Sequence, residues 1–258
     1  MSPLPRAALL AALLAAGQAG PGQAQSADPT RDYTPGEPPA GTTWYVLADP
    51  AAQAADRRYV EGMRPHHEGA ITMSEEYLKD PEARSPTLRR LAQAIIANQR
   101  FEIALLEDVA RQIAAPARVL DVGFLRLALQ PVAMEGLGPA WHFQKWPIPG
   151  PVDLLAGPPP TERDVQFAKG MAIHHQAAVE MARDYDADPK AKNGFLKWLN
   201  IGIITDQMQE IALMQAVIRR YPGDPEQVRV DPSMIHGMEG HGGAAAAGHA
   251  DPPPHHHH

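Results

Sequence analysis

The chain has 258 residues, with 23 Lys and Arg against 30 Asp and Glu, a formal net charge of -7, 12 His, 10 Met and no Cys. The absence of Cys excludes disulfides, thiolate zinc sites, a Cys nucleophile and iron–sulfur clusters with Cys ligands. The acidic balance, without any basic tract, argues against a nucleic-acid partner. Any soft metal ligand must therefore be Met or His.

The N-terminus has the pattern of an export signal. Arg6 precedes an apolar run over residues 7–16, and Gly22 and Ala24 offer small residues for cleavage. This pattern predicts a signal peptide over residues 1–24 and a periplasmic or extracellular protein. The run is about half the length that a membrane helix needs, and no later stretch is longer. We therefore expect no membrane span after cleavage, and an N-terminal extension over residues 25–54.

An internal repeat dominates the rest of the chain. Residues 59–73 align without a gap on residues 167–181, and residues 95–106 align on residues 203–214 at the same offset of 108. Two segments in one register indicate a duplication. Apolar residues three or four apart predict two helices per repeat, over 57–79 and 86–113 in the first (55–115) and over 164–186 and 193–220 in the second (161–222). Four such helices predict an all-α fold, an antiparallel four-helix bundle in which the two repeats form one domain.

The segment between the repeats, residues 116–160, contains nine Pro and two Trp among many apolar residues. We interpret it as a long ordered crossover with one short helix near residues 121–129, and see no alternating strand pattern. Residues 223–258 are predicted to form a flexible tail. Its last four residues, His255–His258, indicate a purification tag.

Met and His residues recur on one face of the first predicted helix in each repeat. At about 100° per residue, the side chains fall within one third of the helix circumference. They are Met63, His66, His67 and Met73 in the first repeat, and Met171, His174, His175 and Met181 in the second. Thioether sulfur with imidazole suits copper, Cu(I) in particular, with Cu(II) as the alternative oxidation state. The competing interpretation is that these Met and His simply fill the helical core.

The second helix of each repeat contributes polar residues to the same interior. Gln99 and Glu102 correspond to Gln207 and Glu210 at the offset of 108. A buried carboxylate needs a partner, and a hydrogen bond from His to Glu would orient the imidazole. Met214 adds a sulfur where the first repeat has Leu106.

The tail carries a further set of soft donors, which we consider an accessory site: Met234, His236, Met238 and His241. No Glu-x-x-His pair, phosphate loop, nucleophile elbow or His-Glu-x-x-His motif occurs in the chain. The sequence therefore nominates no catalytic residue.

These motifs resemble the family known as domain of unknown function 305, whose mark is Met-x-x-His-His-x-x-Ala-x-x-Met followed by Gln-x-x-Glu-Ile, occurring twice. The matching residues are Met63, His66, His67, Ala70, Met73, Gln99, Glu102 and Ile103, and Met171, His174, His175, Ala178, Met181, Gln207, Glu210 and Ile211. The resemblance covers about residues 55–220. It implies a ferritin-like four-helix bundle in an exported bacterial protein, and the chain resembles the CopM-like copper-binding members, which are linked to periplasmic copper tolerance and homeostasis. The long crossover, and Leu106 in place of a Met, depart from the pattern.

We therefore expect a non-catalytic, exported protein that binds copper and buffers or delivers it, with a protein partner for metal transfer. One alternative is a ferritin-like redox enzyme with another metal or cofactor on the same His residues. Another is a structural or adaptor module in which Met and His are core and no metal binds. The sequence leaves the oligomeric state open.

Overall fold

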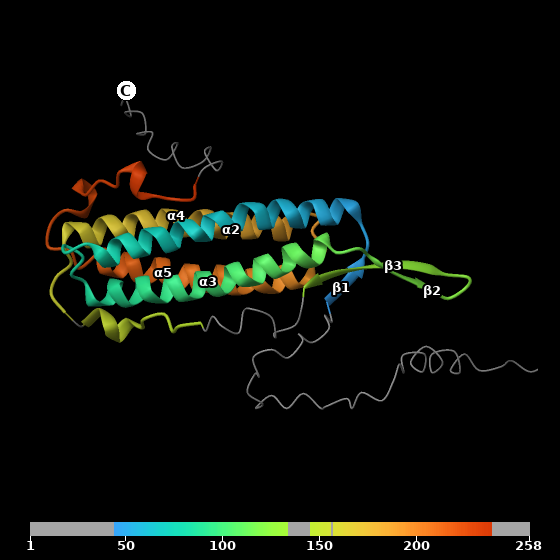
Figure 1. Ribbon diagram of the computed structural model, residues 1–258. Helices are drawn as coiled ribbons and strands as arrows, with labels where there is room; N and C mark the ends of the chain where they lie inside the picture. The colour runs from blue at the N-terminus through green and yellow to red at the C-terminus, as the bar shows by residue number, and fades with distance from the viewer. Residues whose placement is uncertain (1–43, 134–144, 156, 239–258) are drawn as a thin grey trace, which may run out of the picture. The chain divides into compact units, whose positions relative to one another are not determined.

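The computed structural model describes residues 44–133, 145–155 and 157–238 (Figure 1). The elements are β1 (Trp44–Leu47), α2 (Pro50–Lys79), α3 (Pro86–Ala114), β2 (Arg118–Asp121), β3 (Arg126–Ala133), α4 (Glu162–Ala187) and α5 (Gly194–Ile218), with short 3-10 turns at Pro151–Leu155, Pro225–Gln227 and Pro232–Met234. The predicted all-α class and the bundle of two helix pairs are confirmed. The predicted signal peptide, most of the N-terminal extension and the terminal His run lie outside the described residues.

The two first helices begin earlier than predicted because other residues cap them. Asp49 accepts hydrogen bonds from the backbone of Ala51 and Ala52, so α2 starts about two turns before Asp56. In α4 the cap is Thr161, and Asp164 completes a capping box with it. Asp side chains at helix starts satisfy backbone N–H groups that have no partner within the helix.

The repeats are related by a two-fold pseudo-symmetry in space. The α2 and α4 helices run antiparallel, since the Tyr59 and Tyr185 rings lie 4.5 Å apart near one end and the Tyr77 and Phe167 rings lie 4.0 Å apart near the other. An offset of 108 converts each ring pair into the other. Short turns after α2 and α4 return the chain as α3 and α5, which form the second layer of the bundle (Figure 1).

Buried hydrogen bonds between the repeats follow the same symmetry. The Tyr77 hydroxyl donates to Asp164 at 2.5 Å, and the Tyr185 hydroxyl donates to Asp56 at 2.7 Å. Both carboxylates are at most 2% exposed. Each repeat therefore supplies the acceptor for the other repeat's tyrosine, which fixes the register of α2 against α4.

The short helix predicted near residues 121–129 is wrong. The segment forms a β2–β3 hairpin that turns at Gly123, whose φ is +82°, and β1 pairs with β3 to complete an antiparallel sheet in the order β1-β3-β2. Gln130 fixes β3 to the bundle by donating to the carbonyl oxygens of Gln112 and Ala115 at the end of α3. Pro131, which cannot donate to a ladder, lies in β3 opposite the irregularity at Trp44/Tyr45.

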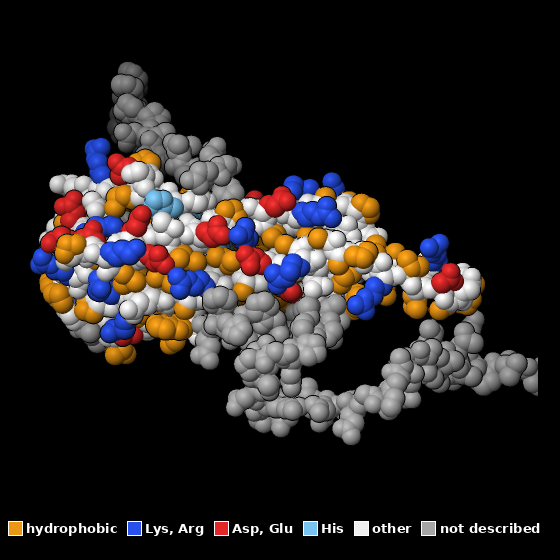
Figure 2. Space-filling model, in the orientation of Figure 1, with side chains coloured by type: hydrophobic (Ala, Val, Ile, Leu, Met, Phe, Trp, Pro, Cys, Tyr) orange, Lys and Arg blue, Asp and Glu red, His pale blue; other side chains and the backbone are white. Residues whose placement is uncertain are grey.

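The buried apolar residues form two clusters. The first contains Met63, Leu106 and Ile203, and the second contains Met73, Met171 and Met214. On the surface, acidic and basic side chains are interspersed over the visible face (Figure 2). Within the described residues, no helix combines the length and apolar character needed to cross a membrane.

The chain after α5 does not begin as a flexible tail. Residues 225–238, which we call the strap, lie along α2 and α4. Lys169 donates to the carbonyl oxygens of Pro225 and Val228, and Val228 is buried. The prediction failed because these contacts are tertiary and leave no periodic pattern in the strap itself. Of the predicted tail donors, Met234, His236 and Met238 lie in the strap, while His241 falls outside the described residues.

Candidate metal centre

The four predicted His side chains meet in the middle of the bundle. All are at most 1% exposed. His66 from α2 and His174 from α4 stack on each other, with ring centroids 3.7 Å apart and a 36° angle between the planes. Since these residues correspond at the offset of 108, the stacked pair marks the pseudo-symmetry axis.

The second His of each pair turns toward a glutamate on the neighbouring helix. The His67 Nε2 and Glu102 Oε2 atoms are 2.9 Å apart, and the His175 Nε2 and Glu210 Oε2 atoms are 2.6 Å apart. The first contact has hydrogen-bond geometry, and the second is a close contact between a ring nitrogen and a carboxylate oxygen. The predicted role of Glu as the group that orients His is thus geometrically available in both repeats.

One charged residue of this centre comes from outside the repeats. Lys145, in the crossover, lies 3.5 Å from Glu102 and 2.6 Å from Asp206. Burial lowers the pKa of Lys145, but the two carboxylates outweigh burial and leave the pKa above its usual value. Burial raises the pKa of Glu210, with His175 opposing it. Sequence analysis missed Lys145 because the crossover has no counterpart in the duplication.

Several buried polar atoms of this centre have no hydrogen-bond partner in the described structure. They are His67 Nδ1, His175 Nδ1, Gln99 Oε1 and both amide atoms of Gln207. The His174 ring, in contrast, lies within hydrogen-bonding reach of the backbone of His66 and His236. Buried groups of this kind normally have partners, because leaving one without a partner costs about 1–3 kcal/mol. A bound ion or water would supply these partners. The polar atoms are therefore more consistent with a ligand-binding interior than with an ordinary apolar core.

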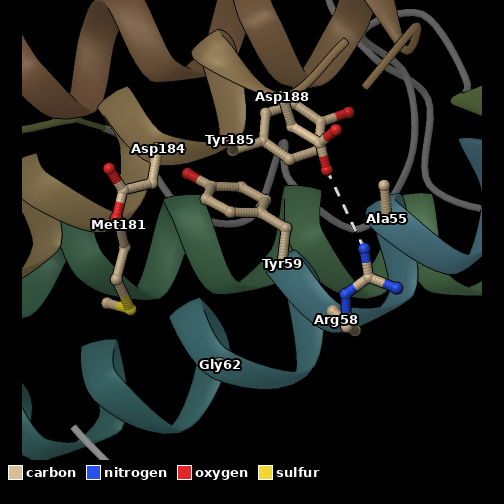
Figure 3. Close-up of a pocket in the computed structure, with 8 residues that line it drawn as sticks. All are labelled: Ala55, Arg58, Tyr59, Gly62, Met181, Asp184, Tyr185 and Asp188. Carbon is tan, nitrogen blue, oxygen red and sulfur yellow. Dashed lines mark ion pairs between the residues drawn. The ribbon is translucent and has the colours of Figure 1, made fainter. Parts of the chain in front are cut away.

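The predicted Met ligands lie on both sides of the His cluster. Met63, Met171 and Met214 are fully buried, and Met73 is 4% exposed. Met181 is half-buried and reaches a surface cavity of about 310 Å³ between α2 and α4, where Arg58 and Asp188 form a loose ion pair at 3.8 Å (Figure 3). Sulfur donors are thus available at each end of the His cluster, and one of them is accessible from solvent.

A smaller cavity of about 30 Å³ lies at the pseudo-symmetric position of the large one. Six of its residues correspond at the offset of 108 to residues of the large cavity. Among these pairs are Met73 with Met181, Glu76 with Asp184, and Gly170 with Gly62. The strap, through Met234, lies on the small cavity, whereas the large one is open.

In the part of the chain that the structure describes, no three His, Asp or Glu side chains converge as a metal-binding group.

The fold and this interior define an all-α bundle of two helix hairpins with a duplicated Met, His and Glu centre. The family model described as "Domain of unknown function (DUF305)" matches residues 23–110 and 154–252. The chain belongs to this family. Neither a curated protein nor a solved structure matches the chain.

The buried His174 predicts a pH dependence of stability. Burial, and then His175 and His67, hold the pKa of His174 well below its ordinary value of 6.5. Below pH 6.5 the unfolded chain therefore binds more protons than the folded chain. The free energy of unfolding should decrease as the pH is lowered, by up to about 1.4 kcal/mol per pH unit, until the pH reaches the folded-state pKa of His174.

Chemical denaturation at pH 7.5 and 5.5 measures this loss in the wild type and in His174→Asn. Glu210, whose raised pKa acts in the opposite direction, is present in both proteins and cancels in the comparison. An equal loss of stability in the two proteins would contradict the assignment to His174.

Proposed function

We propose that the protein is an exported, non-catalytic copper-binding protein that holds Cu(I) in the bundle and buffers or delivers it, as in the CopM-like members. The observation that carries the proposal is the set of buried imidazole and amide atoms without partners, flanked by buried Met sulfur. Such atoms destabilise a fold unless a ligand completes them.

The residues that would hold the ion are His67 and His175, which Glu102 and Glu210 orient. Met63 and Met171 would add sulfur ligands from the preceding turn of the same helices. Neutral imidazole is the form that binds metal. Thioether ligands are uncharged, so a buried Cu(I) would carry only one positive charge into the core, which the two glutamates offset.

Cu(I) competition with a chromophoric chelator tests the proposal. The wild type, lacking His255–His258, is compared with a variant in which His66, His67, His174 and His175 are all changed to Gln. We expect tight binding by the wild type and, in the variant, the loss of the Cu(I) held in the bundle, with helical circular dichroism retained. Equal binding by the two proteins would move the site out of the bundle.

The same samples distinguish the alternative functions. A protein that binds no copper, and whose variant differs only in stability, would be an adaptor with a Met and His core. A retained chromophore or oxidase turnover with another metal would instead indicate a redox enzyme. The exported state is tested separately by N-terminal sequencing of the secreted chain, which we expect to begin near residue 25.

A further inference from the structure

The strap brings two soft donors, Met234 and His236, to the outside of the bundle, while its backbone at His236 reaches His174 of the central cluster. Met234 lines the 30 Å³ cavity together with Met73 and Glu76 of α2. The next strap donor, His236, places Nε2 3.0 Å from Glu76 Oε2. Two thioethers therefore line one small cavity between the strap and the bundle, together with Arg163, and the His236 imidazole lies beside it through its contact with Glu76.

We propose that Met73, Met234 and His236 form a second soft-metal site, with Glu76 orienting His236. This inference rests on the proposed function, because it takes the same ion. The donor set is the one that suits Cu(I), and the cavity is large enough to hold a ligand of the size of a water molecule. Met73 is nearly buried, whereas the His236 side chain is 34% exposed. The site thus lies where solvent meets the core and can exchange its ion.

The pseudo-symmetric end of the bundle shows what the strap adds. Met181 and Asp184 stand where Met73 and Glu76 stand, yet their cavity has about 310 Å³ and its lining includes no second sulfur and no His (Figure 3). Duplication alone therefore accounts for one sulfur and one carboxylate at each end. The additional sulfur and imidazole come only from the strap.

Two positions hold the strap at this end and differ in the other repeat. Gly69 lies under the strap, and a β-carbon there would overlap the carbonyl oxygen of His236 and lie 2.6 Å from its carbon. The equivalent residue in the second repeat is Ala177. Lys169, which anchors the strap, is replaced by Glu61. These two differences between the repeats explain why the strap packs at the end of the bundle that contains Gly69 and Lys169.

Gly69→Ala gives a sharp test because it keeps every proposed ligand while displacing the strap. Met234→Leu removes one sulfur at nearly constant volume. Two controls match them: Gly202→Ala, where a helical β-carbon would make only an ordinary contact of 3.7 Å with Lys145, and Met208→Leu, at a methionine that is 49% exposed.

The full chain and its variants are titrated with Cu(I) against a chromophoric chelator, and backbone hydrogen exchange is followed over residues 228–238. We expect Gly69→Ala and Met234→Leu to lose one bound Cu(I) relative to the wild type, while both controls keep it. Cu(I) should slow exchange in the wild-type strap and leave exchange unchanged in Met234→Leu.

Wild-type copper stoichiometry and strap protection in both Gly69→Ala and Met234→Leu would overturn the strap site and leave the central site standing. Absence of Cu(I) binding by every protein, the wild type included, would overturn the proposed function as well. The bundle variant with four Gln separates the two sites further, because it should keep the ion that the strap variants lose.

Discussion

Replacing Asp164 by alanine is expected to lower the free energy of unfolding by about 4 kcal/mol. Its Oδ1 accepts from the Tyr77 hydroxyl at 2.5 Å and from the backbone N–H groups of Arg84 and Ser85, both at 3.1 Å. Its Oδ2 accepts from the Thr161 backbone at 2.8 Å. The substitution leaves these donors without partners, and each buried one costs about 1–3 kcal/mol. Urea denaturation followed by circular dichroism measures the loss.

The pseudo-symmetric residue provides the matched control. Asp56 accepts from the Tyr185 hydroxyl and from the Asn193 side chain, and it lies inside α2 instead of at a helix start. Asp56→Ala should therefore cost about half as much, roughly 2 kcal/mol. Equal losses for the two variants would show that the capping box and the loop contacts of Asp164 contribute nothing.

Met171→Leu is expected to weaken Cu(I) binding by more than tenfold, equivalent to about 1.4 kcal/mol, while changing the free energy of unfolding by less than about 1.5 kcal/mol. Leu fills nearly the same volume in the core but has no donor atom. Met171 is fully buried and lies one helical turn before His174 and His175. Chelator competition and urea denaturation, performed on the same preparation, separate ligation from packing.

Leu106→Met is the complementary change, since it introduces the sulfur that the second repeat has at Met214. Both side chains are fully buried, so the volume again changes little. Tighter Cu(I) binding by Leu106→Met would support sulfur ligation at this level of the bundle. An unchanged affinity in Met171→Leu would instead assign that methionine to the core alone.

The helices and the His face could be predicted from the sequence because their causes are local. Asp80–Pro81 ends α2, Pro222–Gly223 follows α5, and the helical repeat alone brings His66 and His67 to the buried face. The duplication then requires a second copy of that face. The contact between His67 and Glu102 could also be predicted, because the two helices of a pair lie side by side and both residues are on buried faces.

The sheet, Lys145 and the strap could not be predicted, because each depends on a contact between distant segments. Trp44 pairs with Ala133, across a whole helix pair, and Lys145 meets Asp206 from outside the repeat. A signal for the strap was nevertheless present. Gly69 stands in a helix where the other repeat has Ala177, and a glycine inside one copy of a duplicated helix suggests close approach of another backbone.

The reciprocal contacts of Tyr77 with Asp164 and of Tyr185 with Asp56 have the form of an isologous dimer interface, in which the same patch is used twice. A single hairpin would bury its His face only by associating with a second one. Joining the two in one chain replaces that bimolecular step by an intramolecular one, which does not depend on the concentration of the protein. The assembled centre therefore persists at any protein concentration, whereas an equivalent pair of separate hairpins would dissociate on dilution.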